Sequence, residues 1–374
     1  MLTILEQYPI SKESDLKEIM EKAVQIRNQQ WGNTITYSRK VFVPLTNMCR
    51  DTCSYCAFVQ HPNSPLAKIM SREEVYESVL QAEKMGCKEV LFSLGEKPEK
   101  RYEKARLELK KLGHTTMIEY LAEMCEWVLR NTSLTPHVNA GTLTEEEIVV
   151  LKPFSGSMGM MLETVSNRLL KKGMAHHGCP DKVPDLRLRT LEVTGRLKVP
   201  FTTGILIGIG ETFEERVESL EAIKEIHERY GHIQEVIIQN FQQKPYIKMA
   251  DHPEPSIEDM LRTIATARII LPRDISIQAP PNLHERHRDY INAGINDWGG
   301  ISPITKDFIN PEHAWPEISI LNETTKKMGY ELKERFTVYG DFFQKKIGFV
   351  TDEIRTKLNQ KADQYGHPQN QILH

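Results

Sequence analysis

The stretch KVFVPLTNMCRDTCSYCAF, residues 40–58, joins two features that decide how the chain folds. Its first half is an apolar, β-branched run typical of a buried strand. Its second half places Cys49, Cys53 and Cys56 within eight positions directly after that run. In an α/β fold such as a (β/α) barrel, the chemistry gathers at the carboxyl ends of the strands, which is where this loop would lie.

Similar apolar runs recur along the chain and alternate with helical stretches. Several helices begin with a capping-box pair, such as Ser71 with Glu74 and Thr212 with Glu215. Seven or eight strand–helix units in series imply a parallel sheet and favour a TIM-type (β/α) barrel over a doubly wound sheet. The strands expected after residues 40–45 are 88–94, 136–140, 157–162, 199–208, 234–240, 274–279 and a less regular run at 292–298.

The chain shows no internal repeat and no linker that would divide the barrel. We expect the barrel to span residues 36–330, with an N-terminal helical extension (1–35) and a polar, irregular C-terminal extension (331–374) on its outside. The highly charged segment 97–114 predicts a solvated outer helix.

Composition limits the partners of the protein. With 374 residues, 40% hydrophobic content and net charge -3, the chain can bury a large core but has no excess charge to attract nucleic acid or an anionic membrane. The first residues carry too short an apolar run for a signal peptide, and no run of 18 apolar residues occurs. Cys87, Cys125 and Cys179 are scattered, which indicates reduced thiols. We expect a soluble cytoplasmic protein that acts on a small molecule.

Polar or glycine residues stand at the end of every expected strand or just after it. Because the carboxyl ends of barrel strands share one rim, these residues predict a large polar pocket there. They are Gly95 and Glu96; Asn139; Glu163; Gly208, Gly210 and Glu211; Gln239 and Asn240; Gln278 and Asn282; and Asn296, Asp297 and Trp298.

The three clustered cysteines favour iron over zinc. A structural zinc ion takes four ligands, and only His61 lies near enough in sequence to complete the set. Three thiolates on a four-iron cluster instead leave one iron free to bind another molecule. His176, His177 and Cys179 lack a fourth ligand, so a solvated loop is the better interpretation of that segment.

The spacing C-x3-C-x2-Φ-C, with Tyr55 as the aromatic residue, resembles the motif of the radical S-adenosylmethionine superfamily. The resemblance implies a 4Fe-4S cluster on Cys49, Cys53 and Cys56. It also implies that the open iron holds S-adenosylmethionine, which is cleaved to a 5'-deoxyadenosyl radical.

Other positions resemble that family's cofactor-binding motifs. In SLGEKP (93–98), Gly95 and Glu96 match the segment that takes the methionine amino group, although Leu94 and Lys97 depart from it. Glu163 resembles the ribose ligand, Arg187 the arginine that meets the cofactor carboxylate with Arg189 as a competitor, and Gly208 and Gly210 the adenine contact. A dinucleotide fingerprint is excluded, because its third glycine would fall at Phe213.

From about residue 38 to 340 the chain resembles the first-subunit (CofG) family of 7,8-didemethyl-8-hydroxy-5-deazariboflavin (FO) synthases. LFSLGEKPEKRY, EVIIQNFQQKP and GINDWGGISPITKDFINPEHAWP carry the resemblance, whereas Tyr246, Ile247 and Lys248 replace a Gly-Thr-Pro of the family. It implies a radical lyase that takes the tyrosine-derived adduct of 5-amino-6-(D-ribitylamino)uracil and closes the ring with loss of ammonia. A tyrosine-using, CofH-like partner subunit would supply the adduct, and an external donor the electron.

Polar residues of the expected rim are the substrate-binding candidates. They are Asn139, Gln239, Asn240, Gln278, Asn282, Asn296 and Trp298, with Asp297 as a hypothetical proton acceptor and therefore the catalytic candidate.

Three alternatives stay open. The tyrosine-using sister subunit and related menaquinone-pathway enzymes differ from this family in the eighth-strand segment. A biotin-synthase-like enzyme would need ligands for an auxiliary cluster inside the barrel, and neither Cys87 nor Cys125 is placed for that role. A binding protein with a structural metal site would be recognised by its iron content and by its failure to cleave S-adenosylmethionine.

Overall fold

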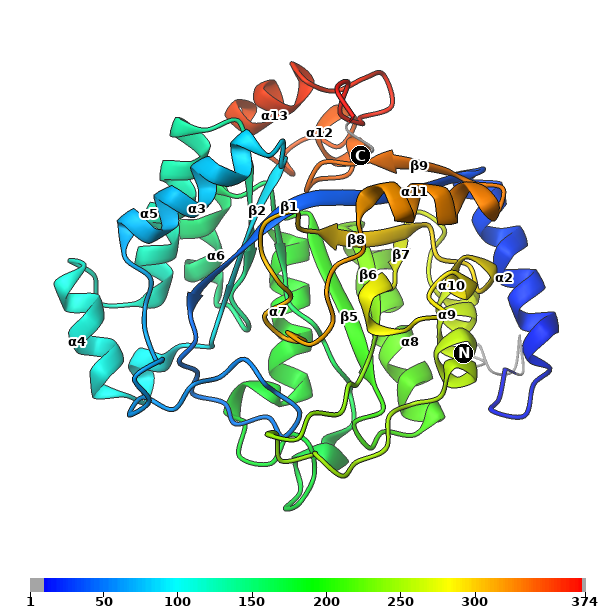
Figure 1. The fold of residues 1–374 in the computed structure, drawn as a ribbon, viewed down its shortest axis with the longest axis horizontal. Coiled ribbons are helices and arrows are strands. Elements are labelled where there is room, and N and C mark those ends of the chain that lie inside the picture. The colour runs from blue at the N-terminus through cyan, green and yellow to red at the C-terminus, as the bar shows by residue number, and fades with distance from the viewer. Residues whose placement is uncertain (1–9, 372–374) are drawn as a thin grey trace.

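The computed structural model describes residues 10–371 and has a closed parallel barrel at its centre (Figure 1). The first nine residues of the predicted N-terminal extension lie outside the described part. Neighbouring strands pair in chain order, and β1 closes the barrel by pairing with both β2 and β8. The predicted barrel is therefore confirmed. Its strands are β1 (Thr34–Thr46), β2 (Glu89–Leu94), β3 (Thr135–Asn139), β4 (Ser157–Gly159), β5 (Phe201–Ile207), β6 (Ile233–Asn240), β7 (Ser276–Gln278) and β8 (Asp297–Ile301).

Helices cover the outside of this barrel. Ser71, Thr144 and Thr212 cap their helices through reciprocal bonds with the glutamate three residues later, as their spacing predicts. The helices are α2 (Leu16–Trp31), α3 (Arg72–Lys84), α4 (Glu103–Lys111), α5 (Met117–Asn131), α6 (Glu145–Leu151), α7 (Pro184–Arg196), α8 (Phe213–Tyr230), α9 (Ile257–Ile270), α10 (Asp289–Asn292) and α11 (Ile318–Lys327).

The eighth strand lies later than the sequence pattern predicts. Residues 289–292 form α10, and β8 begins at Asp297 instead of ending near residue 298. Thr36, close to the start of β1, pairs with Asp297. Asp297 therefore lies at the amino-terminal base of the barrel, and the prediction that residues 296–298 follow the strand at the rim is wrong.

The C-terminal segment closes the base of the barrel. Strand β9 (Glu331–Glu334) pairs with the first residues of β1, and Arg335 enters the barrel to meet Glu235 and Asp297. Helices α12 (Gly340–Gln344) and α13 (Asp352–Asn359) then form a small hydrophobic cluster of their own with Leu129 at the end of α5. The expectation of an irregular segment outside the barrel is wrong, because this segment supplies the floor of the interior.

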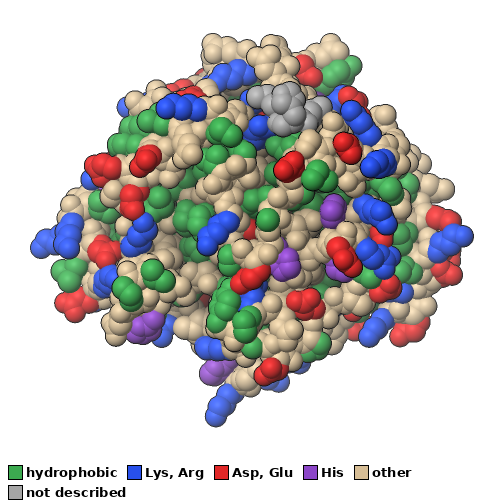
Figure 2. Space-filling view, viewed as in Figure 1, with side chains coloured by type: hydrophobic (Ala, Val, Ile, Leu, Met, Phe, Trp, Pro, Cys, Tyr) green, Lys and Arg blue, Asp and Glu red, His purple; other side chains and the backbone are tan. Residues whose placement is uncertain are grey.

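Alternation along the strands divides the barrel wall into two faces. Val41 and Val43 point outward into the main core under the helices, whereas Lys40 and Phe42 face the interior. On the face seen in Figure 2, acidic and basic side chains are interspersed. No helix among residues 10–371 is both long and apolar enough to cross a membrane.

Candidate active site

Two adjoining cavities occupy the barrel. The rim cavity lies at the carboxyl ends of the strands and is lined by the cysteine loop; the lumen cavity extends down between the strands. Both are bordered by Ser93, Asn139, Met161, Gln239, Ile309 and Asn310.

Cys49, Cys53 and Cys56 all face the rim cavity, together with Tyr55. The loop after β2 supports them, because the Glu96 amide donates to Cys49 Sγ at 3.1 Å. Gly95 permits this approach, since a Cβ there would collide with the Met48 carbonyl oxygen. The cysteine loop and the loop after β2 therefore pack directly against each other.

The geometry of the three thiols suits an iron–sulfur cluster better than a single ion. Their sulfur atoms do not all lie within 4.8 Å of one another. Four thiolates around one zinc ion would be about 3.8 Å apart, given Zn–S bonds of about 2.3 Å. Burial raises the pKa of the Cys49 thiol to about 12, so a bound cluster would have to stabilise its thiolate. These residues fit a cluster that spans the loop.

Glu96 occupies a buried position beside the thiols. Its carboxylate accepts hydrogen bonds from the amide and hydroxyl of Thr142, and Arg187 Nη1 lies 3.9 Å away. Burial raises the pKa of Glu96 to about 7. Gly141 makes room for this carboxylate, because a Cβ there would collide with it. The arrangement gives the rim cavity an acceptor suited to an ammonium group.

Glu163 also borders the rim cavity and has a left-handed backbone, φ +65°. Lys182 Nζ is 2.6 Å from its carboxylate, and although burial raises the pKa of Glu163, Lys182 and Arg187 bring it below the usual value. Sequence reasoning missed Lys182, because the two residues are brought together by the fold.

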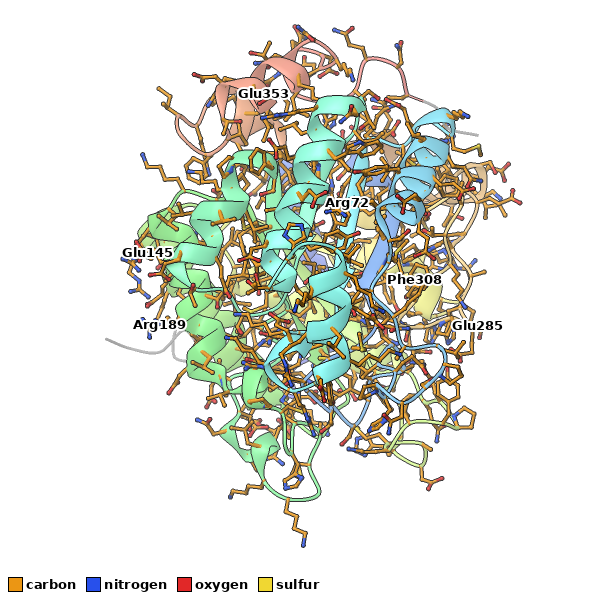
Figure 3. All side chains as sticks on the ribbon, turned by 90° about the vertical axis from the view of Figure 1, so that its left-hand side faces the viewer. Arg72, Glu145, Arg189, Glu285, Phe308 and Glu353 are labelled. Carbon is orange, nitrogen blue, oxygen red and sulfur yellow. The ribbon has the colours of Figure 1, made fainter. Side chains whose placement is uncertain are left out.

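Arg187, on α7, is buried and donates to the carbonyl oxygens of Met161 and Asp181. Arg189 is exposed on the outer surface (Figure 3). Of the two arginines, only Arg187 borders the rim cavity.

The loop after β5 is shaped by Gly208 (φ +86°) and Gly210 (φ +105°). Glu211 accepts from the amides of Gly208 and Ile209 at 2.8 and 2.9 Å. Neither glycine borders the rim cavity, whereas Leu206 and Phe241 do. The glycines thus set the turn while neighbouring side chains form the wall.

A family model described as the Radical SAM superfamily matches residues 43–223. The 7,8-didemethyl-8-hydroxy-5-deazariboflavin synthase of Methanopyrus kandleri is 49% identical over 333 residues, which cover 89% of this chain and 99% of that protein. The chain belongs to this synthase family. The synthase of Methanocaldococcus jannaschii is 46% identical over 343 residues, 91% of this chain and 93% of that protein.

A longer relative and two solved structures are also similar to this chain. The FO synthase of Mycobacterium tuberculosis is 45% identical over 336 residues, 88% of this chain but 39% of that protein. HydG, a maturase of the FeFe-hydrogenase, superposes with a TM-score of 0.71 at 19% identity, covering 93% of this chain and 74% of HydG. Methylornithine synthase superposes with a TM-score of 0.66 at 17% identity, covering 87% and 91%. These two structures support the barrel fold of the synthase family member.

A segment after β4, residues 175–182, holds the cysteine loop of this synthase. The Ser54 amide donates to the Ala175 carbonyl at 2.9 Å, His176 Nε2 lies 3.1 Å from the Tyr55 hydroxyl, and Arg50 pairs with Asp181. The prediction of a solvated loop is wrong for His176, which is buried against Tyr55, and for Cys179, which is buried as well.

Several predicted substrate residues do border the cavities. Asn139 and Gln239 border both, Asn240 borders the rim cavity, and Gln278 and Trp298 border the lumen. Trp298 is fully buried, and its indole N–H donates to Thr325 behind the barrel wall.

Three other predicted residues lie elsewhere. Asn282 binds Asp307 and the His313 carbonyl in the loop that covers the lumen, and Asn296 accepts from Arg268 and the Ile277 amide. Asp297 is fully buried at the base, where Arg335 Nε lies 2.6 Å from its carboxylate. None of the three borders either cavity.

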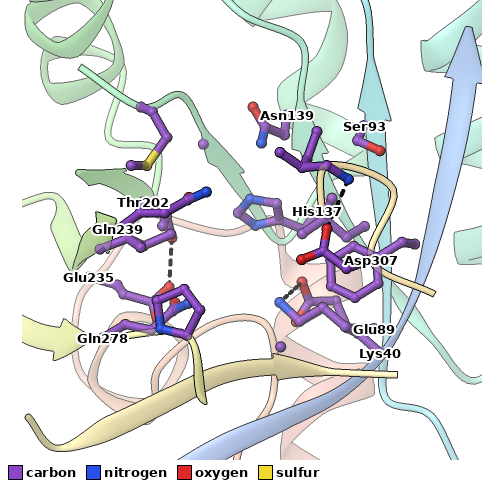
Figure 4. A pocket seen from close by; sticks show the side chains of 18 of the residues that line it. Lys40, Glu89, Ser93, His137, Asn139, Thr202, Glu235, Gln239, Gln278 and Asp307 are labelled. Carbon is purple, nitrogen blue, oxygen red and sulfur yellow. Dashed lines mark hydrogen bonds and ion pairs between the residues drawn. The ribbon is translucent and has the colours of Figure 1, made fainter. Parts of the chain in front are cut away.

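Sequence reasoning missed the charged lower half of the lumen, which Figure 4 shows. Most of these side chains lie inside strands, not after them, and Arg335 directly follows β9. The sequence pattern that could have identified them is the alternation of inward-facing side chains along a strand, as in Glu89, Leu91 and Ser93 or His137 and Asn139. The missed residues are Lys40, Glu89, His137, Thr202, Glu235 and Arg335.

Proposed function

We propose that this chain holds a 4Fe-4S cluster on Cys49, Cys53 and Cys56 and binds S-adenosylmethionine in the rim cavity. The observation that carries the proposal is the shared wall of the two cavities, which sets the three thiols beside a lumen suited to a substrate. Membership of the radical S-adenosylmethionine superfamily and of the synthase family supports it.

The proposed reaction completes FO. When bound, the cluster and S-adenosylmethionine supply a 5'-deoxyadenosyl radical that abstracts hydrogen from the tyrosine-derived adduct of 5-amino-6-(D-ribitylamino)uracil. Ring closure then releases ammonia, which makes the enzyme a lyase, and oxidation of the cyclised radical by an external one-electron acceptor gives FO.

Residues of the rim cavity would orient the cofactor. Glu96 would accept from the methionine ammonium, and Glu163, held by Lys182, would accept from the ribose hydroxyls. Arg187 keeps the end of β4 in place through the Met161 carbonyl and lies beside Glu96. Tyr55 would border the adenine side, with Gly208 and Gly210 shaping that turn.

The chain itself must exclude water from the reaction. The loop after β8 contributes Asp307, Phe308 and Trp315 to the lumen and Asn310 to both cavities. Lys244 Nζ donates to Asn310 Oδ1 at 2.8 Å, which ties this loop to the one after β6. A closed cavity would protect a reactive radical from solvent.

The adduct would come from a tyrosine-using, CofH-like subunit, bound stably or transiently. The M. tuberculosis FO synthase, of which the match covers 39%, is consistent with a second unit in the complete reaction. An external donor would supply the electron, and the free cysteines suit the reducing cytoplasm. Cys87 and Cys125 do not border the lumen, which argues against sulfur insertion of the biotin-synthase kind.

The test is an anaerobic reconstitution with iron and sulfide, followed by dithionite, S-adenosylmethionine, tyrosine, the ribitylaminouracil and the tyrosine-using partner. We expect 5'-deoxyadenosine and fluorescent FO, and neither product above the partner's own background with Cys53→Ala. FO formation that persists in that variant would contradict the proposal. Cleavage of S-adenosylmethionine without FO, in the presence of an active partner, would contradict the substrate alone.

A further inference from the structure

The inward side chains of three strands divide the lumen into layers. Because alternate residues face inward, successive layers are about 6.6 Å apart along each strand. The lowest layer is charged, the middle layer is apolar and the top layer is polar. From bottom to top the residues are Lys40 and Phe42 on β1; Glu89, Leu91 and Ser93 on β2; and Glu235, Ile237 and Gln239 on β6.

The charged floor consists of two pairs. Lys40 Nζ lies 2.8 Å from Glu89, and Arg335 Nη2 lies 2.6 Å from Glu235, which also accepts from the Thr202 hydroxyl at 3.2 Å. Figure 4 shows the Lys40–Glu89 and Thr202–Glu235 contacts at the lower end of the pocket. Buried ion pairs add little stability over apolar residues of equal size. Charges that border a cavity therefore indicate a polar ligand.

His137 adds a polar ring beside the floor. Its Nδ1 lies 2.7 Å from Ser157 Oγ, and that hydroxyl donates to the Thr337 carbonyl. Nε2, the other ring nitrogen, lies on the side of Gly159, another residue of the cavity wall. Burial lowers the pKa of His137 to about 4, so the ring is neutral at pH 7.

The middle layer is a hydrophobic slot. Phe42 stacks on Trp315 with centroids 5.2 Å apart and planes at 5°, and Leu91 and Ile237 border the same cavity. In the top layer, the side-chain amides of Asn139 and Gln239 make no hydrogen bond to another described residue. Both also border the rim cavity with the thiols.

We propose that the lumen binds its substrate end-on, with a polyol chain on the charged floor and the ring system in the apolar slot. Hydroxyl groups both donate and accept, so a polyol can bridge an ammonium and a carboxylate within one pair. The reacting end then lies at the top layer, next to the thiols. This inference rests on the proposed function, whose substrate carries a ribityl chain on a ring system, and it makes Lys40 and Glu89 specificity-determining residues.

The probes are FO itself and an FO analogue whose ribityl chain is replaced by an unsubstituted alkyl chain. Binding to the reconstituted enzyme is measured by anaerobic equilibrium dialysis. The double variant Lys40→Met/Glu89→Met removes both charges together, so no buried charge is left unpaired. Arg72→Met/Glu123→Met, which removes an outer ion pair between α3 and α5, is the matched control.

We expect the double variant to weaken FO binding about 10- to 100-fold. Binding of the alkyl analogue should stay at the wild-type value, and the control should bind both probes normally. If the Lys40/Glu89 variant does not fold, Thr202→Val, which keeps the side-chain shape, should show the same selective loss.

Two results would overturn this inference. Equal weakening of both probes, or unchanged FO binding, would mean that the floor does not hold the polyol, while FO production by the wild type would still uphold the proposed function. A cluster-loaded wild type that binds neither probe and forms no FO would contradict the proposed function itself.

Discussion

Arg335 Nε lies 2.6 Å from Asp297 Oδ2, and the same guanidinium reaches Glu235 at 2.6 Å. This contact joins the segment after β9 to the base of β8 and β6, and all three side chains are buried. The arginine both closes the barrel and forms part of the lumen floor.

Replacing Arg335 by methionine should therefore destabilise the protein strongly. The change leaves Asp297 and Glu235 buried without their cation, which typically costs about 3–5 kcal/mol. Chemical denaturation of the holoenzyme measures the loss. Arg229→Met, which breaks an exposed pair with Glu192, is the control and should cost less than about 1 kcal/mol. Equal losses of stability in the two variants would show that the buried contact does not stabilise the fold.

Asp297→Asn separates a structural role from a catalytic one. The substitution weakens the contact with Arg335, so we expect a lower denaturation midpoint and, because Arg335 borders the lumen, a higher KM. Because Asp297 itself borders neither cavity, kcat per cluster-loaded enzyme should stay within about twofold of wild type. Steady-state FO formation with purified adduct measures both constants. A large loss of kcat in a variant of normal stability would instead assign Asp297 to the chemistry.

Cys53→Ala and Cys179→Ala should behave differently although the two thiols lie in the same region, with Cys53 half-buried and Cys179 buried. Cys53 borders the rim cavity and Cys179 does not. We expect Cys53→Ala to lose nearly all iron and acid-labile sulfide, and Cys179→Ala to retain the wild-type content. Metal analysis and electron paramagnetic resonance after reduction provide the measurement. Loss of the cluster from Cys179→Ala would require a different ligand set.

His137 should make stability depend on pH. Burial lowers its pKa from 6.5 to about 4, so between these values the unfolded state binds more protons than the folded state. Stability should fall as pH decreases through this window, by about 1.6 kcal/mol between pH 6.5 and 5. Denaturation of wild type and His137→Asn at several pH values tests this. Parallel pH profiles for the two proteins would rule out His137 as the source.

Strand positions and helix caps were predictable from local patterns. The alternation of apolar runs with capped helices predicts the barrel, and the spacing C-x3-C-x2-Φ-C predicts the cysteine loop. The position of β8 was not predictable in this way, because its sequence DWGGI contains two glycines, which have low β-propensity. Pairing with β1, which brings Thr36 to Asp297, fixes the strand in that place.

Contacts between distant segments were the main features that sequence reasoning could not supply. Arg50 and Asp181 are 131 residues apart, and Glu235 and Arg335 are 100 apart. Charges such as Lys40 and Glu89 within strands suggest a solvent-facing side until the sheet closes. Once it closes into a barrel, the same alternation places them inside the lumen.

The most direct test uses the adduct isolated from the tyrosine-using enzyme and supplied to this chain alone, with S-adenosylmethionine and reductant but without the partner. We expect FO and 5'-deoxyadenosine to form in matching amounts in a single turnover. Cleavage of S-adenosylmethionine without conversion of the adduct, in a fully cluster-loaded enzyme, would contradict the assignment of this chain to the ring-closing step.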